Sequence, residues 1–273
     1  MRPIELAASF GEGLGYGVVI GPLSAEILAH RQAHRTDELV SPVREMAEVA
    51  LWAVGSDPTT FSIEHRKHHH EEVVYPPGSI FHAFKKTLGD SYVSRRHTKN
   101  ILADEELHGA LVFQGLDPAN DPILKYDEAG KPVGVKRTIV GEALTKLPEP
   151  LSNLAIPSLL VAARYRRYMN RHSEVPMPRA LAWYSGFLLG SSLAALYAGM
   201  PEHKEGGPAP TAGKDMRPKA LHLIVPSASF RHKSHHEAPA QRDTPGAPPY
   251  SIDIVYTRIL DKLKLLKQDR TQL

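Results

Sequence analysis

Apolar residues are concentrated in a few stretches of the chain, separated by mostly polar segments. Residues 43–55 repeat apolar positions with the period of a helix that has one wide apolar face. Residues 14–29, 150–168 and 180–200 are more evenly apolar and predict three further helices. Since the helical period dominates, the fold class expected is mainly α: a helical bundle formed by one domain over residues 1–273.

Two other segments carry a pattern. Residues 122–140 contain two short strand-like runs around Gly130, which predicts a small β-hairpin. Residues 251–267 predict an amphipathic helix whose other positions carry several basic residues. A helix that packs on the domain is favoured there over one that lies on a membrane surface. The apolar stripe of this helix consists of Ile252, Val255, Ile259, Leu263 and Leu266.

The segment 180–200 carries no charge and is the only one long enough to cross a bilayer. A buried core helix is the alternative, because serine and glycine dilute its apolarity. The charge-free part of the first segment, residues 14–25, is too short to span upright. A mean hydropathy of −0.29 argues against many spans. The sequence therefore predicts a reduced or partial transmembrane part.

Composition excludes several classes of function. The 273 residues carry a formal net charge of +3, which is small for a protein that binds nucleic acid. There is no cysteine, so disulfides, thiolate catalysis and cysteine-ligated zinc or iron–sulfur centres are excluded. The chain does contain 15 histidines, and most of them are clustered.

Three histidine groups share spacings of three or four residues, which place their members on one face of a helix. The second and third groups have the same spacing, and such a match seldom arises by chance in one chain. A solvated basic patch is the alternative for the second group, because Arg66 and Lys67 stand between its histidines. The groups are His30 and His34; His65, His68 and His69; and His232, His235 and His236.

Imidazole is a ligand for iron, copper, zinc and nickel. Eight such ligands exceed the needs of one ion, whereas two ions with open positions would use them. Because the groups contain no carboxylate, a site rich in nitrogen ligands is expected, and iron fits an open, redox-active site best. Five histidines outside the groups are interpreted as ordinary polar residues: His82, His97, His108, His172 and His222.

The three groups resemble the histidine boxes of the membrane fatty-acid desaturases, which belong to the wider group of di-iron desaturases and hydroxylases. The chain has HRQAHR, then EHRKHH about thirty residues later, and finally FRHKSHH. The sequence HKSHHEAP and the tail YSIDIVYTRILDKLKLLKQDR also resemble that family. The resemblance covers roughly residues 20–75 and 195–270.

The resemblance implies two iron ions held by the three groups, with O2 as co-substrate. It adds His203 as a further ligand, although Gly199 stands where the family has an asparagine. It also implies a double bond introduced into a fatty acyl chain on an acyl lipid, acyl-CoA or acyl-carrier protein. Carboxylates that could orient the imidazoles are Glu64, Glu71, Glu72, Glu237 and Asp253.

Two electrons for each turnover must come from a separate carrier, such as a ferredoxin, a rubredoxin or a protein of the cytochrome b5 type. The family implies association with a membrane and a metal site on the cytoplasmic side, and a peripheral or soluble location stays open. Two alternatives remain: a hydroxylase of a lipid or other aliphatic substrate on the same scaffold, and a non-catalytic histidine-rich metal-binding protein.

Overall fold

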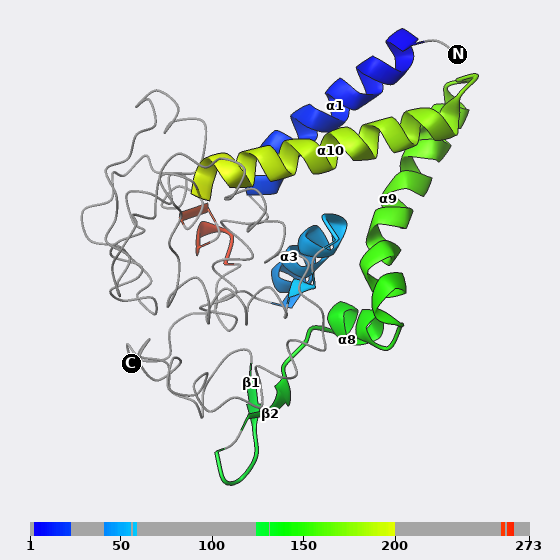
Figure 1. The fold of residues 1–273 in the computed structure, drawn as a ribbon. Coiled ribbons are helices and arrows are strands. Elements are labelled where there is room, and N and C mark those ends of the chain that lie inside the picture. The colour runs from blue at the N-terminus through cyan, green and yellow to red at the C-terminus, as the bar shows by residue number, and fades with distance from the viewer. Residues whose placement is uncertain are drawn as a thin grey trace, which may run out of the picture.

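The computed structural model describes residues 3–22, 41–55, 57–58, 124–130, 132–199, 258–259 and 261–264. Helices make up most of these residues, which confirms the expected mainly α class for the described part of the chain (Figure 1). The elements are α1 (Pro3–Pro22), α3 (Ser41–Ala53), β1 (Leu124–Tyr126), β2 (Pro132–Val135), α8 (Ile139–Thr145), α9 (Glu149–Asn170) and α10 (Pro176–Gly199).

Helix α1 starts at Pro3, well before the predicted segment 14–29. In the sequence, Glu5 and Glu12 interrupt the apolar run that precedes this segment. In the structure both carboxylates have arginine partners on other helices, so they do not interrupt the helix. Of the predicted segment, residues 23–29 lie outside the described part.

Helices α1 and α10 lie side by side and run in the same direction, in backbone contact (Figure 1). Gly13 on α1 lies against the carbonyl of Trp183, and Gly186 on α10 lies against that of Phe10. A Cβ atom at either glycine would overlap the opposing carbonyl oxygen. Gly17 and Gly190 repeat this contact one turn further along each helix. Only glycine allows two helix backbones to approach this closely.

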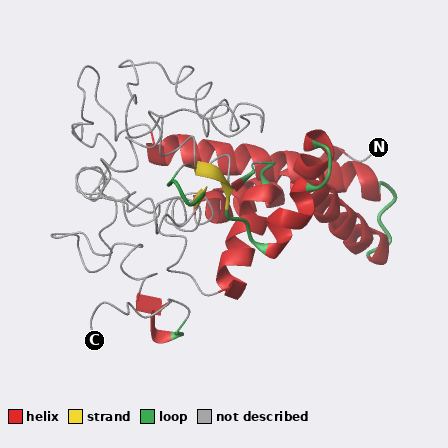
Figure 2. Ribbon diagram, turned by 90° about the horizontal axis from the view of Figure 1, so that it is seen from below, coloured by secondary structure: helices red, strands yellow, loops and turns green. Residues whose placement is uncertain are grey.

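Helix α9 precedes α10 and packs against both α10 and α3. Figure 2, coloured by type of secondary structure, shows how far helices predominate among the described residues. The core between them contains Trp183 and Phe187, whose rings stack at 5.6 Å, together with Ala53 at the end of α3. Leu160 on α9 packs against this cluster, and Trp52 on α3 is fully buried. Helix α10 therefore contacts α1 with its glycines and contacts α9 and α3 with its aromatic side chains.

The predicted hairpin is confirmed. Strands β1 and β2 pair antiparallel, with Leu124 opposite Val135. The turn between them is closed by a hydrogen bond of 3.0 Å from the Gly130 N–H to the Asp127 carbonyl. Gly130 has a φ of +78°, a conformation that favours glycine.

Two further expectations concern the later part of the chain. Within the described ranges, no helix is long and apolar enough to cross a bilayer, α10 included, although the sequence favours a span at 180–200. Of the predicted C-terminal helix 251–267, only residues 258–259 and 261–264 are described. Arg258, Ile259, Asp261 and Lys262 are helical there, and a turn follows them.

The glycine contact predicts opposite effects of alanine at two positions of α1. Gly13→Ala is expected to lower the free energy of unfolding by about 1–3 kcal/mol, because its methyl group overlaps the α10 backbone. Gly15→Ala is the control, since nothing lies within 4 Å of its added Cβ. Its higher helix propensity should raise stability by up to about 1 kcal/mol. Urea unfolding followed by circular dichroism measures both, and equal effects would contradict the contact.

Candidate functional site

The histidines predicted to bind metal lie outside the described residues. The same holds for the carboxylates proposed to orient them. Whether these side chains converge on one point therefore stays a prediction. The histidines concerned are His30, His34, His65, His68, His69, His203, His232, His235 and His236.

Among the residues that the structure does describe, no group of three histidine, aspartate or glutamate side chains could hold a metal ion. His172 is the one histidine within the described ranges, and it is exposed in the turn after α9. Its φ of 53° lies in the left-handed region, which histidine enters more readily than most residues. This position agrees with its interpretation as an ordinary polar residue.

The described helices do define where the chain continues toward the histidine groups. Since α1 and α10 are parallel, Pro22 and Gly199 end them on the same side. The C-terminal end of α3 contacts the middle of α10, where the Tyr184 hydroxyl donates a hydrogen bond of 2.9 Å to the Ala53 carbonyl. The ends of α1 and α3 that lead to predicted ligands are thus both held by α10, whose own end leads to His203.

A cluster of charged side chains joins the first half of α1, the last turns of α9 and the start of α10. Arg164 on α9 donates to Glu12 on α1 at 2.9 Å, and Arg167 lies 3.6 Å from the same carboxylate. The Arg164 guanidinium also lies over the Trp183 ring, 4.0 Å from its centroid, which adds a cation–π contact. The hydroxyl of Tyr168 donates to Glu12 at 3.4 Å.

Arg179 connects α10 to α1, as Arg164 connects α9 to α1. Its Nε donates to the Ser9 hydroxyl at 3.1 Å, and its guanidinium lies 3.5 Å from a Glu5 carboxylate oxygen. The guanidinium also lies 4.3 Å from the centroid of the Tyr168 ring. The sequence patterns did not predict this cluster. The signal for it was the presence of acidic residues in one apolar segment and arginines in two others.

A second polar junction holds α3 against α8. Glu48 on α3 is buried and accepts a hydrogen bond from the Thr138 hydroxyl, which in turn accepts one from the Gly141 N–H at 3.1 Å. Glu45 accepts from the N–H groups of Ile139 and Val140 at 3.0 and 3.2 Å. Glu45 and the Thr138 hydroxyl thus satisfy free N–H groups in the first turn of α8, and Glu48 holds the Thr138 hydroxyl in place.

Burial raises the pKa of Glu48 above its ordinary value of 4.5, because the charged form is poorly solvated there. The hydrogen bond from Thr138 and the nearby charge of Arg44 oppose this shift. A buried acid with a raised pKa is a common property of catalytic sites. Here its contacts with Thr138 account for its position, so a structural role explains it.

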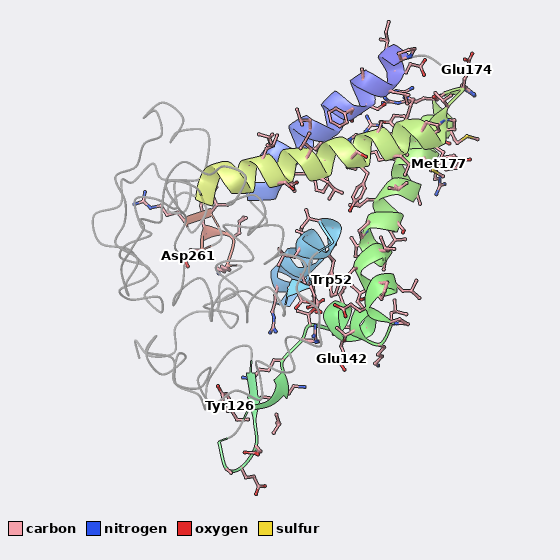
Figure 3. All side chains as sticks on the ribbon, viewed as in Figure 1. Trp52, Tyr126, Glu142, Glu174, Met177 and Asp261 are labelled. Atoms are coloured by element: carbon pink, nitrogen blue, oxygen red, sulfur yellow. The ribbon has the colours of Figure 1, made fainter. Side chains whose placement is uncertain are left out.

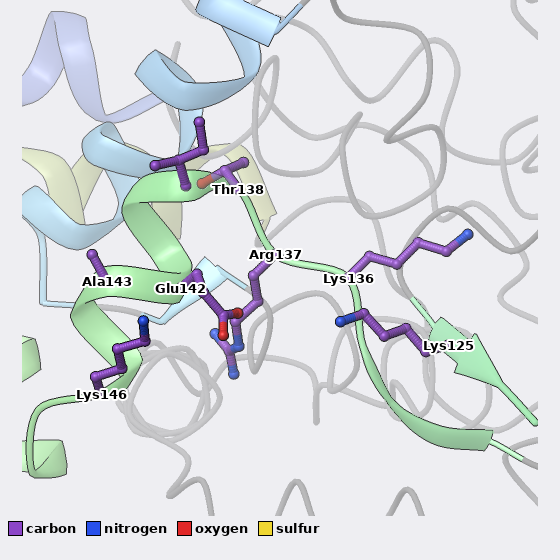
Figure 4. A pocket seen from close by; sticks show the side chains of 8 residues that line it. Lys125, Lys136, Arg137, Thr138, Glu142, Ala143 and Lys146 are labelled. Atoms are coloured by element: carbon purple, nitrogen blue, oxygen red, sulfur yellow. The ribbon is translucent and has the colours of Figure 1, made fainter.

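An open cavity lies between the hairpin and α8 (Figure 4). Its volume is about 580 Å³, within the range of small-ligand pockets. Lys125, Lys136 and Lys146 line it, and Glu142 is the acidic residue among its lining. Arg137, which also lines the cavity, forms an ion pair of 3.1 Å with buried Asp57. The remaining lysines give the cavity a positive charge that suits an anion.

No protein-family model matches the chain, and neither a curated protein nor a solved structure does. Its function is therefore inferred from its own residues. These are the histidine groups of the sequence and the helix arrangement described above.

The raised pKa of Glu48 predicts how stability depends on pH. Protonated Glu48 contributes fully below the ordinary value of 4.5, and this contribution is lost as pH rises through the folded-state pKa. Glu48→Gln cannot ionise, so its stability relative to the wild type should increase from acidic to neutral pH. Glu142→Gln, on the exposed face of α8, is the control. Urea unfolding across pH measures the difference, and parallel Glu48→Gln and wild-type curves would contradict it.

Proposed function

We propose that the chain is an O2-dependent di-iron oxidoreductase that introduces a double bond into a fatty acyl chain. The observation that carries this proposal is the spacing of the three histidine groups along the sequence. Two of the groups repeat one spacing, and the order of the groups resembles that of the membrane fatty-acid desaturases. A non-catalytic metal-binding protein would not require three such groups of imidazoles in one chain.

The proposed ligands suit the metal. Neutral imidazole binds iron, and eight histidines with His203 leave room for open positions on two ions. When bound, the iron pair would supply the activation of O2 that removes hydrogen from an unactivated C–H bond. The protein would hold and orient the imidazoles, position the acyl chain and exclude water from the site.

The arrangement of the described helices supports this proposal. His203 follows Gly199 by four residues, so it lies within about 14 Å of the end of α10 by chain length alone. His30 follows Pro22 by eight residues, which allows at most about 28 Å. Since α1 and α10 end on the same side, these limits allow both histidines to reach a common site.

The proposal includes a separate electron donor and an association with membranes. The chain has no cysteine, so it cannot carry a rubredoxin or ferredoxin centre of its own. A ferredoxin, a rubredoxin or a cytochrome b5 would therefore supply the electrons. The acyl substrate would be part of a lipid, or bound to coenzyme A or an acyl-carrier protein. The metal site would face the cytoplasm.

Metal content tests the site directly. The full-length chain, purified with detergent and loaded with iron-57, should contain about two irons per molecule in a coupled, nitrogen-rich site, as Mössbauer spectroscopy and elemental analysis report. His68→Ala should lower the iron content, because it removes a proposed ligand. His172→Ala is the matched control, since it removes an exposed histidine outside the three groups. One zinc, no metal, or equal loss in both variants would overturn the proposal.

Product analysis tests the reaction. The iron-loaded protein, given O2 and a reduced electron donor in the presence of acyl lipids, should yield acyl chains with two fewer hydrogens. Mass spectrometry of released fatty acids detects this loss, and His68→Ala should abolish it. An acyl chain with one added oxygen would instead indicate the hydroxylase. Two bound irons without any O2 consumption would indicate a metal-binding protein that is not an enzyme.

A further inference from the structure

Helices α1, α9 and α10 differ from ordinary water-exposed helices in where their charged residues lie. The charged residues of α1 and α10 are Glu5, Glu12 and Arg179, and all three are paired in the contacts between helices. The exposed positions of these two helices are uncharged. In a water-soluble helix the opposite is normal, with charges outside and apolar residues inside.

Large apolar side chains occupy this uncharged exterior. Val19 on α1 is 62% exposed, Leu159 on α9 is 65% exposed and Leu181 on α10 is 51% exposed. The exterior of α9 is likewise uncharged from Pro150 to Ala163. Apolar surface that is continued over three helices marks a contact with another apolar phase or partner.

The charged residues of this helical unit that are fully exposed lie at one end. Arg166, Arg167 and Arg171 are exposed where α9 ends, beside the turn to α10. Glu174 is the acidic residue of that turn, and half-exposed Met177 follows it at the outer corner of the molecule (Figure 3). Arg167 lies near Glu12, whereas Arg166 and Arg171 form no ion pair with any of the described residues.

We propose that this end of the molecule binds an anionic phospholipid bilayer. Arg166 and Arg171 would contact headgroup phosphates, and the uncharged exterior of the three helices would enter the acyl region beside them. Arginine suits this position because its apolar stem can lie along acyl chains while its guanidinium reaches the headgroups. The proposal rests on the membrane association included in the proposed function.

A bilayer fits better than a protein partner for two reasons. The exposed apolar side chains are spread over three helices, whereas a protein interface usually has a compact apolar core with a polar rim. The exposed basic residues lie at one end of that surface, as they do in segments that bind anionic lipids at the membrane–water boundary. The exposed lysines of the cavity, by contrast, lie at the hairpin and α8, at the opposite end of α9 from Arg166 and Arg171 (Figure 1).

Flotation with lipid vesicles tests the proposal on the full-length chain. The vesicles contain phosphatidylcholine alone or phosphatidylcholine with phosphatidylglycerol. The double variant Arg166→Gln/Arg171→Gln should bind the anionic vesicles about 30-fold more weakly than the wild type, from the loss of two charges near the surface. The control Lys125→Gln/Lys146→Gln removes the same charge from exposed positions at the cavity and should bind as the wild type does.

Circular dichroism checks that both double variants are folded. The salt dependence of wild-type binding is a second measurement, and it needs no variant. Binding to anionic vesicles should weaken steeply as salt rises. Equal binding of the wild type to neutral and anionic vesicles, or equal loss in the two double variants, would overturn the proposal. Iron content is measured on the same preparations, so failure to bind lipid and failure to bind iron are distinguished.

Discussion

The backbone contact between α1 and α10 determines the rest of the described arrangement. Because Gly13 and Gly186 have no side chain, the two helices approach until the backbone of each contacts the carbonyl oxygens of the other. This approach brings Glu5 within reach of Arg179. The two helices are parallel, which places Pro22 and Gly199 on the same side. The pairing of Glu5 with Arg179 and the alignment of the two helix ends both depend on how closely α1 and α10 pack.

The charge cluster explains why the helical unit has an apolar exterior. An isolated carboxylate such as Glu12 would be costly among apolar helices, so it is stable there only when paired. Arg164 supplies that pair and also covers the Trp183 ring. Once Glu5, Glu12 and Arg179 are used in internal contacts, only uncharged side chains remain for the outer faces of α1 and α10. The proposed lipid contact is therefore a consequence of how the interior is held together.

The junction of α3 with α8 connects this unit to the segment that carries the second histidine group. Glu48 and Glu45 fix the start of α8, and Asp57 is bound to Arg137 just before that helix. Asp57 precedes His65 by eight residues, so the chain is anchored shortly before the proposed ligands. The buried ion pair and the buried carboxylate give this anchor its specificity, because neither tolerates the loss of its partner.

The sequence by itself determined the helical class, the hairpin at Gly130 and the identity of the proposed metal ligands. These follow from periodicity, turn chemistry and the spacing of imidazoles, all of which are local properties. The start of α1 and the charge cluster were decided by the tertiary structure. In the sequence Glu5 and Glu12 only interrupt an apolar run, because their partners Arg179 and Arg164 lie more than a hundred residues away. Whether a charged residue in an apolar helix is stabilised depends on the partner beside it in space, and only the fold supplies that partner.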